Sequence, residues 1–534
     1  MTFWHKRQGM GLASVLLGGS ILLSRFTGLA RDKIISYLFG ATSESDLYFA
    51  AFVIPDFINY LLAGAYFSIT LIPLLATHFD RDREDGWRFF SAVFTWTAVA
   101  ITAVTLIAMV YARELAHAAA PGMDAAALER LARFLRIIMP GQVFFLTGSC
   151  MSALLYLRRQ FLVPALTPIV YNAAIIIGGV ALRHRGMEGF CWGVLAGAFI
   201  GNFLLPCLAA RYGGGLHLRF TLFHPGLKGF MVLALPLMLG QSIVVLDEQF
   251  IRIFGSMAGT SVISWLNYAR RIMLAPVGVV AQAAGVASYP FLSELIAKKD
   301  YPLFDRTINA ALRNTLVLLI PMSLWMIAAS DPIIRLIFQQ GGFTASDTAN
   351  TARLLMIFLS VIACWGFQQI LGRGFYARRD TLTPAVIGTL ATLASIPLFF
   401  LLTRLLHAQG VALASSLAIS LYALALGLWW RRRFGSNAFS GLGAVVWRTT
   451  LCSAVAAVPA LCVGELSPIG KTAHPYLSSI FSIVSSGCVF AVVFALIAPR
   501  LAPDALEPFL AKGGPLAARL LGRLSRGAGK LKGD

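Results

Sequence analysis

The sequence predicts an all-α polytopic membrane protein with fourteen transmembrane helices. Of its 534 residues, 58% are apolar and only 13% are charged, which is about half the charged fraction of an ordinary globular chain. Apolar runs of about 20 residues, the length that crosses a bilayer as a helix, recur along the whole chain. A soluble multidomain protein is excluded, because so few charged side chains could not cover its surface in water.

Fourteen apolar segments account for the predicted helices. The apolar run that opens the first segment comes after Lys6 and Arg7, as in a signal peptide. Ser24, Arg25, Arg31 and Asp32 follow this run instead of a small-residue cleavage site, so we interpret the segment as a membrane helix. The predicted spans are 9–38, 46–77, 89–111, 131–157, 161–182, 188–210, 229–258, 262–295, 307–330, 349–376, 381–403, 409–430, 444–465 and 475–499.

The basic residues predict the orientation of these helices. With the amino terminus in the cytoplasm, 25 of the 44 Lys and Arg residues fall in the tails and even-numbered connections, and 7 fall on the opposite face. This bias follows the positive-inside rule and predicts that both termini are cytoplasmic. It also explains the net charge of +20 without nucleic acid, because the charges are spread over alternate loops. We expect the basic tail to lie on anionic membrane lipids.

An internal repeat predicts two lobes of six helices each. The segment from Tyr156 to Pro164 recurs from Tyr376 to Pro384, with Tyr, both Arg, Leu and Pro identical at an offset of 220. Because six is even, the halves share one orientation and would enclose a central cavity. The alternative is that Arg-Arg and Pro recur in any cytoplasmic hairpin. The predicted parts are an N-lobe at 1–220 (helices 1–6), a C-lobe at 221–436 (helices 7–12), helices 13–14 at 437–500 and a basic cytoplasmic tail at 501–534.

Charged residues inside the first segment are candidate functional residues, because ionisable groups at membrane depth are costly. Arg25 and Arg31 are six residues apart, so they project about 120° apart on a helix and could both border a wide cavity. Asp32 could pair with Arg31 or with a basic residue of another helix. The alternative is that Arg31, Asp32 and Lys33 mark a helix end at the headgroups.

A second arginine pair, Arg270 and Arg271, lies in the eighth segment. Adjacent helical residues face different directions, so one of them would face the cavity while the other snorkels or forms an ion pair. The planar fork of arginine suits phosphate, and Arg25, Arg31 and Arg271 together would make a midmembrane site that fits a diphosphate. The alternative is structural ion pairing between the lobes.

The seventh segment contains the paired carboxylates Asp247 and Glu248. Such groups form coupling-ion sites for sodium or protons in transporters, although pairing with Arg252 or Arg271 is an equal alternative. Enzyme motifs such as a P-loop or a zinc signature are missing from the sequence, and the scattered histidines and cysteines predict no cofactor or metal. We therefore predict transport driven by an ion gradient or the membrane potential. No oligomeric state follows from the sequence.

Between Asp331 and Asp347, a Gly-Gly pair predicts a structured external loop in which Thr344 or Ser346 caps the next helix.

Six segments spread along the chain carry a family resemblance. They are Ser24-Arg25 to Arg31-Asp32, Asp46 with Ile54-Pro55, Gly64 to Ser68 and Pro73, Ser264-Trp265 to Arg271, Phe338 to Asp347, and Phe375 to Pro384. Together these motifs resemble the MurJ/MviN lipid II flippases of the multidrug/oligosaccharidyl-lipid/polysaccharide exporter superfamily, over nearly the whole chain.

The resemblance implies fourteen helices in two lobes around a cationic cavity, with the last two helices forming a lipid-facing groove. It implies a bacterial inner-membrane flippase that moves undecaprenyl-diphosphate-linked disaccharide-pentapeptide, lipid II, to the outer leaflet by alternating access. By the same resemblance, Arg25, Arg31 and Arg271 would bind the diphosphate. Asp32, Asp46 and Arg270 would be supporting charges, and Asp247 would be a candidate sodium ligand.

The chain departs from the family pattern at two places. Asn59 and Tyr60 stand where the family usually has an arginine pair, and Arg270 stands where an acidic residue is common. The alternatives are therefore export of another polyprenyl-linked oligosaccharide, ion-coupled drug antiport within the same superfamily, or a non-transporting scaffold with this fold. An arginine-rich cavity disfavours cationic drugs, because like charges repel.

Overall fold

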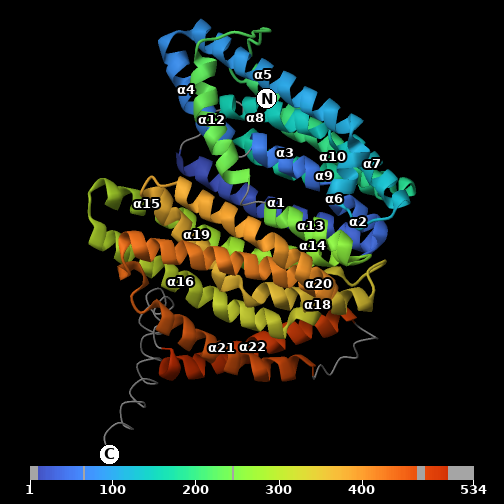
Figure 1. Cartoon of the computed structure of the whole chain (residues 1–534), viewed down its shortest axis with the longest axis vertical. Coiled ribbons are helices and arrows are strands. Elements are labelled where there is room, and N and C mark those ends of the chain that lie inside the picture. The colour runs from blue at the N-terminus through green and yellow to red at the C-terminus, as the bar shows by residue number, and fades with distance from the viewer. Residues whose placement is uncertain (1–9, 64–65, 243–245, 466–474, 503–534) are drawn as a thin grey trace, which may run out of the picture. The chain divides into compact units, whose positions relative to one another are not determined.

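The computed structural model describes residues 10–63, 66–242, 246–465 and 475–502, and these residues form helices and no strands (Figure 1). Each of the fourteen predicted segments is helical over its described residues, which confirms the predicted fold class. Lys6, Arg7, Gly64, Ala65 and nearly all of the predicted basic tail lie outside the described residues. The chain divides into two compact units, residues 1–264 (unit 1) and 265–534 (unit 2).

Unit 1 holds the first thirteen helices and the start of α14. Short 3₁₀ and π turns interrupt them at Arg183–Arg185 (η2) and Ala198–Leu204 (η3). The helices are α1 (Met10–Phe39), α2 (Ser43–Ala50), α3 (Val53–Ala63), α4 (Tyr66–Arg81), α5 (Arg83–Val110), α6 (Ala112–Ala119), α7 (Ala125–Ile138), α8 (Gly141–Leu157), α9 (Leu162–Ala181), α10 (Glu188–Gly197), α11 (Leu205–Tyr212), α12 (Gly226–Ser242) and α13 (Leu246–Ala258).

Unit 2 holds the remaining helices, with a π turn at Val277–Gln282 (η4) and a 3₁₀ turn at Asn437–Phe439 (η5). A positive φ of 48° at His407 breaks the long α20 into two helices, which correspond to the predicted segments at 381–403 and 409–430. The helices are α14 (Val262–Pro276), α15 (Ala283–Ala297), α16 (Tyr301–Ala328), α17 (Ser330–Phe338), α18 (Ala345–Ser360), α19 (Ile362–Ala377), α20 (Leu382–Phe434), α21 (Leu442–Glu465) and α22 (Pro475–Leu501).

Among the described residues, nine helices or helix runs are long and apolar enough to cross a membrane. The pair α18 and α19, bent by 45°, raises this number to ten when it is taken as one span. The predicted first, second and seventh segments fall outside this set but are helical, as α1, as α2 to α4, and as α12 with α13. The protein is thus a polytopic helical membrane protein.

A stripe of glycines spaced four residues apart packs α10 and η3 against α9. A Cβ atom on Gly193 would lie 2.8 Å from the Ala174 carbonyl oxygen, and one on Gly197 would lie 2.9 Å from the Tyr171 carbonyl oxygen. Small residues at this spacing let membrane helices approach backbone to backbone. The contact holds α9 firmly in unit 1, and α9 in turn packs along α1.

Each unit has its own apolar core. In unit 1, Phe89 and Phe90 of α5 pack with Met151 of α8. In unit 2, Phe375 of α19 and Trp430 of α20 pack edge to face with ring centroids 4.9 Å apart. The last two helices, α21 and α22, lie side by side in unit 2 and pack on α16 (Figure 1).

The compact units divide at residue 264, whereas the repeat places the lobe boundary at residue 220. The difference arises because α12 packs against α3, α4 and α5, and α13 packs against α2, α3 and α6, all within unit 1. The assignment of helices to two repeated lobes concerns the sequence repeat and stays a prediction.

The repeated Arg-Arg segments fold into the same turn in both units. Arg158 and Arg378 end their helices, and Arg159 and Arg379 adopt left-handed conformations with φ of 59° and 61°. The amide of each left-handed arginine donates to the carbonyl three residues earlier, at 3.0 and 2.9 Å respectively. The identical residues of the repeat therefore form the same turn in each unit, which supports the prediction of a true repeat.

Candidate functional site

The candidate site in unit 1 is built on α1, where Arg31 and Asp32 form an ion pair. The Nε and Nη2 atoms of Arg31 donate to Oδ1 of Asp32 at 3.0 and 2.9 Å. The Asp32 side chain is 1% exposed and the Arg31 side chain 17% exposed. Of the two alternatives for Asp32, the structure therefore shows pairing with Arg31. A buried carboxylate needs such a partner, and Asp32 orients the guanidinium in return.

Asn172 of α9 joins this pair and was not identified from the sequence. Its Oδ1 accepts from Nη1 of Arg31 at 3.3 Å, and its Nδ2 donates to Oγ1 of Thr27 at 3.3 Å and to the carbonyl of Pro168 at 3.1 Å. One amide thus ties α1 to α9 and helps to orient Arg31. The available signal was a single asparagine within an apolar membrane segment.

Arg25 and Asp46 differ in their surroundings. Arg25 lies on α1 and is exposed. Asp46 lies on α2, is 2% exposed, and its Oδ1 accepts from the backbone amide and the hydroxyl of Ser264 at 2.8 and 2.6 Å. These groups belong to the first turn of α14, where a carboxylate is stabilised by unsatisfied amides and the helix dipole. Asp46 thus fixes the start of the helix that carries Arg270 and Arg271 further along.

The predicted carboxylate pair of α13 lies beside a buried arginine. Arg252, whose side chain is 9% exposed, donates to Glu248 at 2.7 Å and to Asp56 of α3 at 2.8 Å. The alternative of pairing with Arg252 is therefore correct for Glu248, whereas the coupling-ion role of Asp247 stays a prediction. Asp56 was not identified from the sequence, although it follows Ile54 and Pro55.

In unit 2, the adjacent arginines of α14 have different surroundings, and which of them faces a cavity stays a prediction. Arg270 is 8% exposed, and its guanidinium carbon lies 5.5 Å from the ring centroid of Trp365 on α19. This distance allows a cation–π contact. Arg271 is half-buried. Arg25 and Arg31 belong to unit 1 and Arg271 to unit 2, so their convergence on one anion stays a prediction.

The predicted external loop is structured and anchored to α14. Thr344 caps α18 in a capping box with Asp347, which confirms Thr344, rather than Ser346, as the cap. The other carboxylate oxygen of Asp347 accepts from Nε1 of Trp265 at 2.9 Å. Trp265 therefore holds this loop against the helix that carries Arg271.

Sequence relatives confirm the resemblance stated above. The family model described as "Lipid II flippase MurJ" matches residues 35–482 of this chain. The lipid II flippase MurJ of Burkholderia cenocepacia is 27% identical over 432 residues, which cover 79% of this chain and 84% of the relative. The probable lipid II flippase MurJ of Rhizobium tropici is 27% identical over 450 residues, which cover 82% of each chain.

Solved structures show the same fold. A lipid II flippase MurJ in an inward closed conformation matches with a TM-score of 0.76 at 24% identity, covering 91% of this chain and 99% of that one. An inward-facing multidrug resistance MATE family transporter of the MOP superfamily matches with a TM-score of 0.67 at 15% identity, covering 80% and 99%. Because the family model matches most of its length, the chain, a multi-pass inner-membrane protein, belongs to the lipid II flippase MurJ family.

Proposed function

We propose that this chain is a transporter that moves lipid II, undecaprenyl-diphosphate-disaccharide-pentapeptide, from the inner to the outer leaflet of the bacterial cytoplasmic membrane by alternating access. Membership of the lipid II flippase MurJ family carries the proposal. The arginines within α1 and α14 support it, because the substrate carries a diphosphate that must cross the apolar part of the membrane.

We assign different roles to the three arginines. Asp32 offsets much of the charge of Arg31 and binds two of its nitrogen atoms. Nη1 of Arg31 donates one N–H to Asn172, and its second N–H is suited to a fixed, directional hydrogen bond to the substrate. Arg25, which is exposed, and Arg271 would add positive charge to the site. Electrostatic attraction to a diphosphate grows with positive charge, so loss of both residues would weaken binding.

The energy source would be a sodium or proton gradient, or the membrane potential. We assign Asp247 of α13 to a coupling ion, as the family resemblance suggests. Both termini would be cytoplasmic. The proposed partners are the lipid-linked substrate and the surrounding membrane lipids, without nucleic acid.

Growth of a flippase-depleted bacterial strain tests the function and the site together. Expression of the wild-type chain should restore growth, and R25A combined with R271A should abolish this rescue at equal protein level. Replacement of two exposed arginines, R113A with R183A, is the matched control and should preserve rescue. Failure of a well-expressed wild-type chain would argue against the function, and full rescue by R25A/R271A would refute the proposed anion site.

The second candidate function is export of another polyprenyl-linked oligosaccharide. Asn59 and Tyr60 favour it, because the family's arginine pair is replaced there by uncharged side chains. Binding of lipid II to the purified protein, compared with binding of other polyprenyl-diphosphate sugars, separates the two. Preference for another glycan would select the second function. A flat lipid-flipping signal in liposomes, for every substrate, would instead indicate a non-transporting scaffold.

A further inference from the structure

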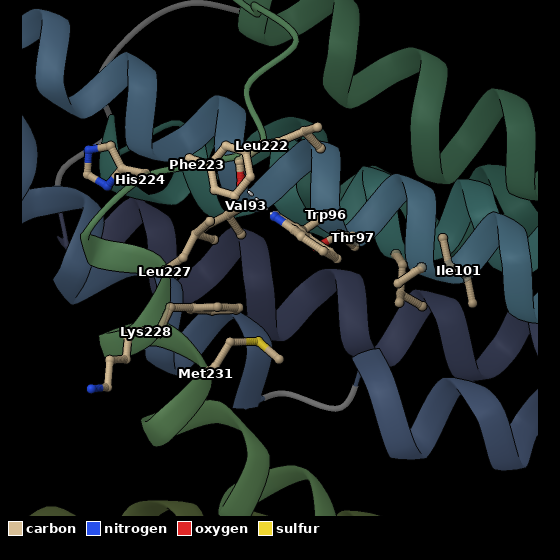
Figure 2. Close-up of a pocket in the computed structure, with 13 residues that line it drawn as sticks. Val93, Trp96, Thr97, Ile101, Leu222, Phe223, His224, Leu227, Lys228 and Met231 are labelled. Carbon is tan, nitrogen blue, oxygen red and sulfur yellow. Dashed lines mark hydrogen bonds between the residues drawn. The ribbon is translucent and has the colours of Figure 1, made fainter.

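An apolar groove runs along one side of unit 1, between α5 and α12 (Figure 2). Its volume of about 470 Å³ lies within the range of about 300–1,000 Å³ that is typical of small-molecule sites. Val93, Trp96 and Ile101 of α5 line it together with Phe230 and Met231 of α12. From Val93 to Ile101 the groove follows α5 over about 12 Å, at 1.5 Å per residue.

The loop that precedes α12 is fastened to α5 and completes the groove. Nε1 of Trp96 donates to the carbonyl of Leu222 at 2.8 Å, a contact drawn in Figure 2, and the amide of Arg219 donates to Oγ of Ser91 at 3.2 Å. Because the Trp96 indole N–H is already satisfied, the rest of its ring presents an apolar surface. The groove is therefore preformed and suited to an apolar chain.

A hydrogen-bonded cluster of two histidines and a carboxylate lies at the polar end of the groove. Nδ1 of His224 accepts from the Gly226 amide at 3.0 Å, so the proton of the neutral ring is on Nε2, which donates to Asp85 at 3.1 Å. His78 contacts the other oxygen of Asp85 at 2.7 Å. A metal ion would need a lone pair on Nε2, but in this arrangement Nε2 carries the proton. The cluster therefore positions the loop through hydrogen bonds.

Lys228 supplies positive charge at this end of the groove, where the two histidines hold the carboxylate of Asp85. The sequence has no acidic residue between Glu188 and Asp247, but it has Arg211, Arg219 and Lys228 there. Lys228 lines the groove, is exposed, and extends away from Trp96 at one end (Figure 2). The nearby carboxylate of Glu84 is engaged by Arg88 at 3.0 Å and by Arg219 at 3.6 Å, so it does not cancel Lys228.

Exposed aromatic residues on the same loop place it at a membrane interface. Phe220 and Phe223 are 78% and 88% exposed, on either side of Thr221 and Leu222. Phenylalanine beside basic residues is typical of segments that lie in the headgroup layer. The positive-inside rule assigns this connection to the cytoplasmic side. The groove then leads from the cytoplasmic headgroups toward the hydrocarbon layer.

We propose that this groove binds one acyl chain of an anionic glycerophospholipid from the cytoplasmic leaflet, with the lipid phosphate at Lys228. Apolar walls receive the chain, and the lysine at the open end selects the negative headgroup over a zwitterionic one. Basic pockets between membrane helices on the cytoplasmic side recognise anionic lipids in this way. The site is separate from the substrate arginines and does not depend on the flippase assignment.

Fluorescence of Trp96 tests the proposal in the full-length protein. The protein is placed in vesicles of unlabelled phosphatidylcholine. Two series of vesicles contain increasing fractions of a lipid with brominated acyl chains, which is phosphatidylglycerol in one series and phosphatidylcholine in the other. The difference between wild type and W96F isolates the Trp96 signal. We expect half-maximal quenching of Trp96 at a fraction of brominated phosphatidylglycerol that is about fivefold lower than the fraction of brominated phosphatidylcholine needed for the same effect. This ratio corresponds to about 1 kcal/mol from one lysine at a lipid phosphate.

K228Q should lower that ratio to about one, whereas K298Q, which removes an exposed lysine of unit 2, should leave it unchanged. A100F, which fills the groove, should reduce the quenching of Trp96 by both lipids. Equal quenching by the two lipids in wild type would refute headgroup selection. Unchanged selection in K228Q would refute the role of Lys228, and unchanged quenching in A100F would refute occupancy of the groove.

Discussion

Arg31 and Arg252 are each paired with a carboxylate inside a helical segment, and the two carboxylates differ in how far they could be predicted. Asp32 is adjacent to Arg31 in the chain, so the sequence alone indicates this pair as one alternative. Asp56 is 196 residues away from Arg252, and no local pattern brings them together. Ion-pair partners that are close in the sequence can be predicted from helix geometry. Distant partners are brought together by tertiary packing, which the local sequence pattern does not encode.

Asn172 gives a prediction at this scale. N172A removes the amide that joins Arg31, Thr27 and the Pro168 carbonyl. We expect a loss of about 1–3 kcal/mol, because buried polar partners lose their hydrogen bonds, together with weaker growth rescue from a less fixed Arg31. Thermal unfolding of the purified protein measures the first effect. The exposed N314A is the control and should change stability little; an equal effect of both would contradict the structural role of Asn172.

Arg378 gives a second prediction. Its guanidinium carbon lies 4.0 Å from the ring centroid of Phe434 and 4.6 Å from that of Phe304, and its Nη2 lies 3.4 Å from Asp305. R378A should destabilise unit 2 by about 2 kcal/mol, through loss of cation–π contacts and an uncompensated carboxylate. The neighbouring R379A removes an exposed arginine from the same turn and should cost far less. Unfolding midpoints in a denaturant series compare the two, and similar midpoints would count against the aromatic contacts.

Helices and turns were more predictable than their contacts. All fourteen predicted segments are helical over the described residues, because runs of apolar residues of membrane length leave the backbone few other ways to satisfy its hydrogen bonds. The break at His407 within α20 lies in the predicted connection between residues 403 and 409, where Arg404 and His407 interrupt the apolar run. The π turn at Ala198–Leu204 instead lies within a continuous apolar run, and apolar periodicity alone contains no signal for it.

The glycine stripe of α10 gives a prediction for one helix pair. G193V would place its Cβ 2.8 Å from the Ala174 carbonyl and from the Ile175 Cα atom. Both are backbone atoms of α9, so the helices must separate. We expect a loss of stability of at least about 2 kcal/mol, as for other overpacked contacts, and low yield of folded protein. A Cβ on Gly443 of α21 would meet nothing within 4 Å, so G443V is the matched control. Equal yields of the two variants in size-exclusion chromatography would contradict the packing.

For the whole molecule, we interpret the net charge of +20 as a signal of topology rather than of a binding partner. The positive-inside rule predicts that most basic residues set the orientation, and the functional candidates are the few arginines left at membrane depth. The last helix pair packs within unit 2 on α16, which agrees with its position after the repeated halves. The proposed anion site could be predicted only as a set of residues, because its members come from two units.

The orientation of the chain can be tested with two cysteines on opposite sides. The positive-inside rule places Ser346, before the capped helix α18, outside and Ser436, after the basic end of α20, in the cytoplasm. Both residues are exposed, and the native exposed cysteines Cys462 and Cys488 are first changed to serine. In cells with a permeabilised outer membrane, an impermeant maleimide should label S346C but label S436C only after lysis.

The result also tests the break at His407. Between the two positions lie α18 and α19, taken as one bent span, and α20 with its break at His407. These helices cross the membrane three times if the break separates two spans, and three crossings put the two cysteines on opposite sides. Labelling of both cysteines in unlysed cells would show instead that α20 crosses once.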